Sequence, residues 1–305
     1  MRREPVTWGI VLALLSLYFI WGSTYMAIRY TLESLPPLLT AGFRFLGAGL
    51  TLYVALRIAG HPHPEGRRWL GAAVVGTLLL FGGNGLVMLA ERHVHSGLVA
   101  VLLASVALWT ALFSGLFGLW PSRRESIGIA IGLVGVVLLN LEGNLQAHPL
   151  GALMVLGSAL SWALGSVLST RLPMPGGLMA AAAQMLCGGA LLTLVGSLLG
   201  ETWPAHPTAL SLWAFAYMLV FGSLVGFTAY NYLLQRVSTS LATSYAYVNP
   251  VVAVLLGVWL GGESISSYGI AALVIILLAV ALVASARTPL PARSRDEFPE
   301  LAEVA

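Results

Sequence analysis

The sequence is short of charged residues. Asp, Glu, Lys and Arg make up only 9% of its 305 residues, no lysine is present, and the single aspartate is Asp296. Soluble globular domains carry roughly 25% charged residues, whereas apolar residues account for 58% of this chain. So few charges cannot cover a water-facing surface, and the remaining environment for so much apolar surface is lipid. The composition therefore excludes a soluble domain and predicts a polytopic membrane protein.

Cysteine and membrane-buried catalytic groups are also scarce. The only cysteine, Cys187, lies in an apolar run, which leaves no disulfide framework and no cysteine-based metal site. Without lysine there is no Walker A motif, so the chain does not hydrolyse ATP by itself. All six histidines lie in the links between apolar runs, and no pair of buried aspartates exists for aspartyl chemistry. We therefore expect a protein that is not an enzyme and holds no cofactor and no metal.

Long apolar segments, by contrast, fill the chain. A helix of about 20 residues crosses the hydrocarbon core of a bilayer, and ten segments approach or exceed that length. They fall at 8–28, 38–58, 70–90, 97–119, 126–141, 150–170, 179–199, 209–233, 241–261 and 267–286. The tail 287–305 is polar and rich in proline, so we expect it to be disordered. The sequence predicts an all-α integral membrane protein with ten transmembrane helices.

The arginines predict the orientation of these helices. With a cytoplasmic N-terminus, twelve of the fifteen arginines fall in cytoplasmic segments, only Arg29 and Arg92 fall on the opposite side, and Arg44 lies within a span. Cytoplasmic loops carry the excess of basic residues in membrane proteins. We therefore predict that both termini are cytoplasmic. The net charge of +3 comes from these loop arginines and does not indicate a nucleic-acid partner.

The two halves of the chain resemble each other. A nearly constant shift of 141–143 residues aligns matching residues in several spans, for example Gly22-Ser23 with Gly165-Ser166. The repeat units, 8–141 and 150–286, hold five spans each. An odd number of spans inverts the second unit in the membrane relative to the first. Inverted repeats around a site near the midplane are the architecture of secondary transporters.

The sequence also resembles the EamA family of the drug/metabolite transporter superfamily over roughly residues 8–286. Short motifs in both halves carry the resemblance: Trp21-Gly22-Ser23-Thr24-Tyr25, Arg44-Phe45, Ser240-Leu241-Ala242, Asn249-Pro250 and Gly262-Glu263. The resemblance implies a ten-helix carrier with inverted repeats, typically an exporter of amino acids or other small metabolites. It also implies a central cavity lined largely by the first, third, fourth, sixth, eighth and ninth spans.

Polar and aromatic side chains inside the spans are the candidates for substrate binding. Polar groups in hydrocarbon are costly and usually face a cavity or another helix. The candidate substrate-binding residues are Trp21, Asn84, Trp109, Trp162, Ser166, Asn231, Tyr245 and Asn249. For each of them, ordinary helix packing is the alternative. Pro250 removes a backbone donor and frees a carbonyl beside Asn249, so we expect a kink there that serves as a gate or packs against a neighbour.

Arg44 is the only charged residue well inside a span. It has two explanations: it receives a substrate carboxylate, or its side chain extends to the outer surface and pairs with a glutamate such as Glu33, Glu91 or Glu142. The second span is not among the cavity helices that the family resemblance implies. We therefore expect a structural role for Arg44.

Together these features predict a secondary transporter of the cell inner membrane that exports a small-molecule substrate by alternating access. Neutral or aromatic amino acids are the expected substrates. The alternatives are other metabolites such as nucleosides, multidrug cations, or a membrane scaffold that transports nothing. The absence of glutamate from the middle of every span disfavours proton-coupled cation exchange. The expected partners are the substrate and the lipid bilayer, and small-xxx-small pairs such as Gly128 and Gly132 fit a monomer or a homodimer.

Overall fold

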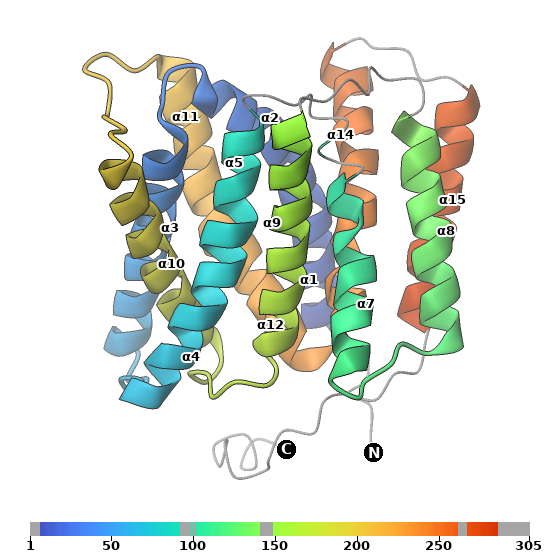
Figure 1. Cartoon of the computed structure of the whole chain (residues 1–305), viewed down its shortest axis with the longest axis horizontal. Coiled ribbons are helices and arrows are strands. Elements are labelled where there is room, and N and C mark those ends of the chain that lie inside the picture. Colours follow the sequence, from blue (N-terminus) through green and yellow to red (C-terminus); the bar gives the residue numbers. More distant parts are fainter. Residues whose placement is uncertain (1–6, 92–98, 100–101, 141–148, 262–266, 286–305) are drawn as a thin grey trace.

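The computed structural model describes residues 7–91, 99, 102–140, 149–261 and 267–285, and within these ranges it contains helices and no strand. The helices stand side by side as a bundle (Figure 1). α1 begins and α15 ends at the same end of this bundle, drawn at the bottom of Figure 1. An all-α membrane fold is thereby confirmed.

Seven helical stretches in the described ranges are long and apolar enough to cross a membrane. Four of them are single helices: Pro37–Ile58 (α3), Pro149–Leu168 (α9), Leu178–Leu198 (α10) and Ser267–Ser285 (α15). The other three are Trp8–Leu32, Gly66–Ala90 and Ala209–Arg236, and each has a π-helical segment in its middle (η1, η2 and η3). The α-helices on either side of these segments are α1 (Trp8–Ser16) and α2 (Gly22–Leu32), α4 (Gly66–Gly76) and α5 (Leu86–Ala90), and α11 (Ala209–Tyr217) and α12 (Thr228–Arg236). The three other predicted spans contain shorter or more charged helices: α7 (Val106–Leu116), α8 (Arg123–Asn140), and α13 (Thr239–Ala242) with α14 (Tyr245–Gly261). The total of ten crossings and the cytoplasmic placement of both termini remain predictions. The tail 287–305 lies outside the described residues.

The most extensive helix contacts join segments that the repeat relates. α3 packs along α10, and α8 packs along α15. In each pair, a shift of about 143 residues carries the first helix onto the second. Equivalent pairings recur nearer the centre, where α9 contacts both η2 and α7 while α2 contacts both α11 and α14. We propose on this basis that 8–141 and 150–286 are the two halves of the molecule.

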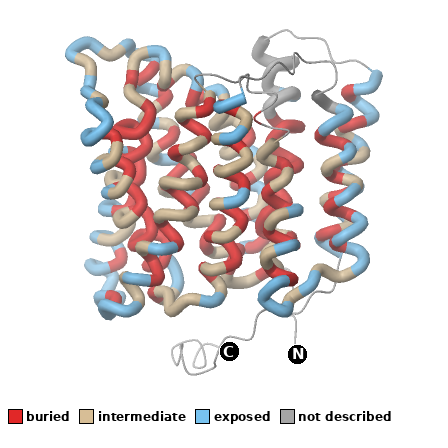
Figure 2. Tube along the Cα trace, viewed as in Figure 1, coloured by how far each residue is buried: buried red, intermediate tan, exposed pale blue. Residues whose placement is uncertain are grey.

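Apolar residues cover both the inside and the outside of the bundle. The faces that the helices turn toward one another are buried, and exposed residues follow the outer faces and the ends (Figure 2). Large apolar side chains such as Leu70, Leu198 and Trp213 are exposed on the outside. In water such a surface would drive association, whereas in a bilayer it contacts lipid.

The start of α3 shows how the two halves are tied together. Pro37 occupies the first turn, where its missing N–H would be unpaired in any case. The backbone N–H groups of Leu38 and Leu39 donate to the Glu201 carboxylate, which lies in the other half, at 3.2 and 2.8 Å. A carboxylate is stabilised at a helix N-terminus by the free N–H groups and the helix dipole. Glu201 therefore caps α3, the helix that carries Arg44.

Candidate substrate-binding site

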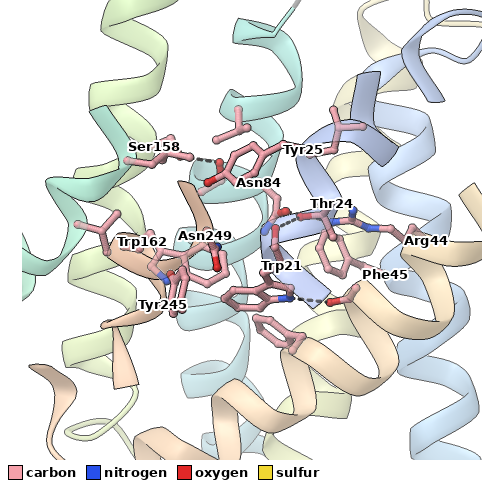
Figure 3. Close-up of a pocket in the computed structure, with 18 residues that line it drawn as sticks. Trp21, Thr24, Tyr25, Arg44, Phe45, Asn84, Ser158, Trp162, Tyr245 and Asn249 are labelled. Atoms are coloured by element: carbon pink, nitrogen blue, oxygen red, sulfur yellow. Dashed lines mark hydrogen bonds between the residues drawn. The ribbon is translucent and has the colours of Figure 1, made fainter. Parts of the chain in front are cut away.

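A cavity lies between the central helices (Figure 3). Its volume is about 90 Å³. On the same scale one water molecule occupies roughly 10–15 Å³, so the cavity admits a small solute. Aromatic residues form much of its wall: Trp21, Tyr25, Phe45, Trp162, Phe227 and Tyr245. Polar residues also line it: Thr24, Arg44, Asn84, Ser158 and Asn249. Both halves of the chain contribute to the cavity.

Three rings of the cavity wall pack with the buried ring of Tyr230, and we call these four the aromatic cluster: Trp21, Trp162, Tyr230 and Tyr245. The Trp21 ring meets the Tyr245 ring edge-on with centroids 4.7 Å apart, and meets Trp162 in the same way at 5.4 Å. Tyr230 lies 5.4 Å from both tryptophan rings and 5.6 Å from Tyr245. Such edge-to-face contacts add to the stabilisation from burial. The cluster joins spans from both halves, so a movement of one half against the other must rearrange it.

Hydrogen bonds hold the polar edges of these rings. Trp21 Nε1 donates to the carbonyl oxygen of Gly222 at 3.0 Å, and Trp162 Nε1 donates to the Tyr230 hydroxyl at 3.1 Å. The Ser166 hydroxyl bonds the same Tyr230 oxygen at 2.5 Å. The indole N–H groups are thus satisfied by protein, and the ring faces are left to contact a solute.

Three spans change to π-helical winding next to the cavity: η1 (Leu17–Trp21), η2 (Thr77–Gly85) and η3 (Met218–Phe227). π-helical segments are rare and occur frequently at functional sites. Backbone carbonyls released from regular pairing inside a membrane need other donors. Ser158 and Ser161 of α9 donate to the carbonyls of Gly83 and Leu78 at 2.8 Å each. η2 and η3 occupy equivalent positions in the two repeats, so this irregular winding recurs.

Glycines allow the aromatic cluster to approach these π-helical segments. A Cβ atom at Gly83 would lie 2.5 Å from Cε3 of Trp162, and one at Gly226 would lie 2.4 Å from Nε1 of Trp21. Both distances are far below van der Waals contact. Any larger residue would therefore displace the indole that it faces.

The structure brings five of the predicted site residues together in the cavity wall: Trp21, Asn84, Trp162, Tyr245 and Asn249. Figure 3 shows Asn249 and Tyr245 on one side and Asn84 near Arg44 on the other. Pro250, which follows Asn249, lies inside the continuous helix α14.

The other three predicted residues do not line the cavity. Ser166 lies behind the aromatic cluster and supports Tyr230. Asn231 is buried, and its Nδ2 donates to the carbonyl of Phe227 at 3.1 Å, one turn earlier on its own span. Trp109 packs against the edge of the hydrophobic core, and its Nε1 is buried without a hydrogen-bond partner among the described residues.

Arg44 differs most from its sequence-based expectation. Its side chain is 4% exposed and lines the cavity instead of extending to the surface. No ion pair joins it to Glu33 or Glu91 in the part of the chain that the structure describes, which does not include Glu142. The sequence contained a signal for a place in the cavity, because Arg44 is the only charge well inside a predicted span and stands in the Arg44-Phe45 motif.

Thr24 and Tyr25 are further cavity residues that the site prediction left out. They follow Trp21 by three and four positions, which places them on the same helix face. That spacing was the signal, and the Trp21–Tyr25 motif contains all three residues.

A bundle of apolar helices around a partly enclosed cavity of rings and amides defines the class of the protein: a membrane transporter. Its sequence matches the EamA-like transporter family over residues 7–141 and again over 149–285. The chain belongs to this family.

The similar proteins agree with this assignment. "Uncharacterized inner membrane transporter YedA" of Escherichia coli (strain K12) is 48% identical over 282 residues, 92% of each chain. "Probable amino-acid metabolite efflux pump" of Salmonella typhimurium is 27% identical over 85% of this chain and 89% of its own. A crystal structure 22% identical in sequence has the same fold, with a TM-score of 0.73 over 90% of this chain and 96% of the other. The protein is thus a multi-pass inner-membrane transporter.

Proposed function

We propose that the protein exports small metabolites by alternating access and that amino acids with neutral or aromatic side chains are its main substrates. The observation that carries this proposal is the cavity, in which aromatic side chains and the amides of Asn84 and Asn249 meet within one small volume. Aromatic walls bind apolar side chains, and a few polar groups fix orientation. The printed name of the Salmonella relative, an amino-acid metabolite efflux pump, supports the same substrate class.

We propose that Trp21, Asn84, Trp162, Tyr245 and Asn249 contact the solute. Ser166 acts through Tyr230 by holding the aromatic cluster. Pro250 contributes by weakening α14 next to Asn249, because proline removes one backbone hydrogen bond from the helix. A solute that binds one arrangement of the halves more tightly than the other shifts the population between them.

The charge of the cavity disfavours the main alternative. No carboxylate lines it among the described residues, so a multidrug cation would find no anionic partner there. Because no carboxylate among the described residues lines the cavity itself, we propose that transport is not coupled to protons.

Counterflow into proteoliposomes tests this proposal. Purified protein is reconstituted with an unlabelled amino acid inside, and uptake of labelled phenylalanine, leucine, serine and glutamate is measured with and without a proton gradient. We expect uptake of the neutral and aromatic amino acids that does not change with the gradient. Gradient-dependent uptake would contradict the uncoupled mechanism. If folded protein takes up none of them, a nucleoside and a lipophilic cation are tested next, and uptake of either would overturn the amino-acid assignment.

A further inference from the structure

Arg44 carries a charge inside the membrane that no acidic side chain among the described residues compensates. Its side chain lies in the first half of α3 with only 4% of its surface exposed. Ionised side chains in spans are expensive, and they pair with an opposite charge or mark a substrate pathway. No carboxylate pairs with Arg44 within the described ranges. A buried guanidinium without an acidic partner in the described part of the chain is suited to an acidic partner that arrives with the ligand.

The hydrogen bonds of Arg44 are also incomplete. A guanidinium has five N–H donors and no acceptor. Nη2 donates to Asn84 Oδ1 at 3.0 Å, and Nη1 faces the Met218 sulfur at 3.3 Å, which is a weak acceptor. Nε is buried with no partner among the described residues. One neutral amide is the only strong acceptor that the described residues offer it, so donors remain for a planar anion.

The position of the guanidinium is fixed by its neighbours. Its central carbon lies 4.2 Å from the centroid of the Phe45 ring, within the range of cation–π attraction. Phe45 meets Phe227 at 6.2 Å, and Phe227 meets Trp162 of the aromatic cluster at 6.4 Å. A chain of rings therefore runs from the charge to the aromatic cluster along the cavity wall.

A complementary acceptor lies elsewhere in the same cavity. Oδ1 of Asn249 is buried and has no hydrogen-bond partner among the described residues. In Figure 3, Asn249 projects from the side opposite Arg44, and Trp21 lies between and below them. The cavity thus presents a cation, an unpaired carbonyl acceptor and aromatic faces around one space.

We propose that Arg44 binds the carboxylate of the transported solute while Asn249 accepts a hydrogen bond from its amino group. The inference rests on the proposed function, because it assigns the recognition chemistry of that same cavity. A single guanidinium neutralises one negative charge, so the preferred ligand is a monocarboxylate that also carries an N–H donor. The α-carboxylate of a neutral amino acid fits, and the corresponding amine or carboxamide does not.

The first test uses the wild-type protein alone. Unlabelled L-phenylalanine, L-phenylalaninamide and 2-phenylethylamine compete against counterflow of labelled L-phenylalanine. We expect the amide and the amine to compete roughly ten- to a hundredfold more weakly than the amino acid, because a site built around a charged hydrogen bond rejects the analogue that lacks it. Equal competition by all three would overturn the role of Arg44 and leave amino-acid transport intact. If the wild type shows counterflow of none of the neutral or aromatic amino acids, the proposed function fails, and the inference fails with it. If leucine is transported and phenylalanine is not, leucinamide and 3-methylbutylamine replace the two analogues.

The second test removes the charge. In Arg44→Gln we expect the competition by phenylalanine to weaken roughly ten- to a hundredfold, while competition by 2-phenylethylamine against residual uptake stays within about twofold, so that the carboxylate preference disappears. Arg57→Gln is the matched control, since Arg57 lies on the same helix, is exposed, and bonds the carbonyl of His61 outside the cavity. Retained carboxylate preference in Arg44→Gln would contradict the proposal. If Arg44→Gln does not fold, the wild-type competition series decides the question by itself.

Discussion

At the scale of single residues, Trp21 connects the cavity to the helices around it. Its ring touches three other rings, and its Nε1 bonds the carbonyl of Gly222 in η3. One side chain therefore serves two purposes, an aromatic surface for the solute and a hydrogen bond between spans of different halves. Substitutions at this position can separate the two.

We predict that Trp21→Ala reduces counterflow more than Trp21→Phe does. Alanine removes both the ring contacts and the hydrogen bond, and losing a large packed aromatic side chain costs about 3–5 kcal/mol where it is buried. Phenylalanine keeps ring contacts and loses the bond, which costs about 1 kcal/mol. Initial uptake rates at equal amounts of reconstituted protein measure the difference. Trp213→Ala, at an exposed position on α11, is the control and should transport at the wild-type rate; equal rates for all variants would remove Trp21 from the site.

Glu91, directly after α5 (Leu86–Ala90), provides a prediction about pH. Burial raises the pKa of its carboxyl from 4.5 to about 8, and the nearby positive charge of Arg29 opposes this rise. The folded protein therefore keeps the proton on the Glu91 carboxyl up to about pH 8, while the unfolded chain releases it near the ordinary carboxyl pKa of 4.5. Between these two values the unfolded state binds fewer protons, so the free energy of unfolding falls as pH rises.

We therefore expect the melting temperature of the wild type in detergent to decrease from about pH 5 to pH 8 and to decrease less in Glu91→Gln. Differential scanning fluorimetry across that range measures both slopes. Glu33→Gln is the control, because Glu33 is exposed and its removal should leave the wild-type slope. An unchanged slope in Glu91→Gln would show that Glu91 does not titrate in this range.

At the scale of elements, the π-helical segments and their glycines shape the cavity. η2 presents Gly83 to Trp162 and its carbonyl to Ser158. Both contacts need the backbone of η2 close to α9. The close approach of two helices thus decides where an aromatic side chain of the cavity lies.

We predict that Gly83→Ala impairs transport. The new Cβ would lie 2.5 Å from Trp162, and overpacking of this kind costs about 1–3 kcal/mol. The indole must move, so we expect counterflow to become several-fold slower, a decrease that corresponds to a barrier about 1 kcal/mol higher. The tryptophan fluorescence should change as well. Gly66→Ala is the matched control, because nothing lies within 4 Å of a Cβ at Gly66. Wild-type transport by Gly83→Ala would show that the Trp162 position does not matter for the solute.

At the scale of the whole molecule, the cavity exists only because two halves of the chain meet. α3 and η2 bring Arg44 and Asn84, while α9 and α14 bring Trp162 and Asn249. The predicted topology places the links after α3 and after α10 on opposite sides of the membrane. That difference is the basis of alternating access between inverted halves.

Cysteine labelling tests this topology. In a Cys187→Ser background, His61→Cys lies in the exposed link after α3, and Thr202→Cys lies in the exposed link after α10. We expect a membrane-impermeant maleimide to label Thr202→Cys in intact spheroplasts and His61→Cys only after permeabilisation. Labelling of both positions from one side would contradict the predicted orientation.

Composition and hydropathy alone were enough to predict a helical membrane protein, and five of the eight candidate site residues line the cavity. The apolar composition indicates that the helices lie in lipid. Polar side chains such as Asn84 and Asn249 stand out in the sequence because they are costly in lipid. Tertiary structure decided which way each helix faces. Phe227 lines the cavity, while Asn231, one turn on, bonds its own span. Arg44 lies on a regular α-helix, α3, and it also faces the cavity. Hydropathy places a residue along a span, and only helix packing decides which way its side chain points.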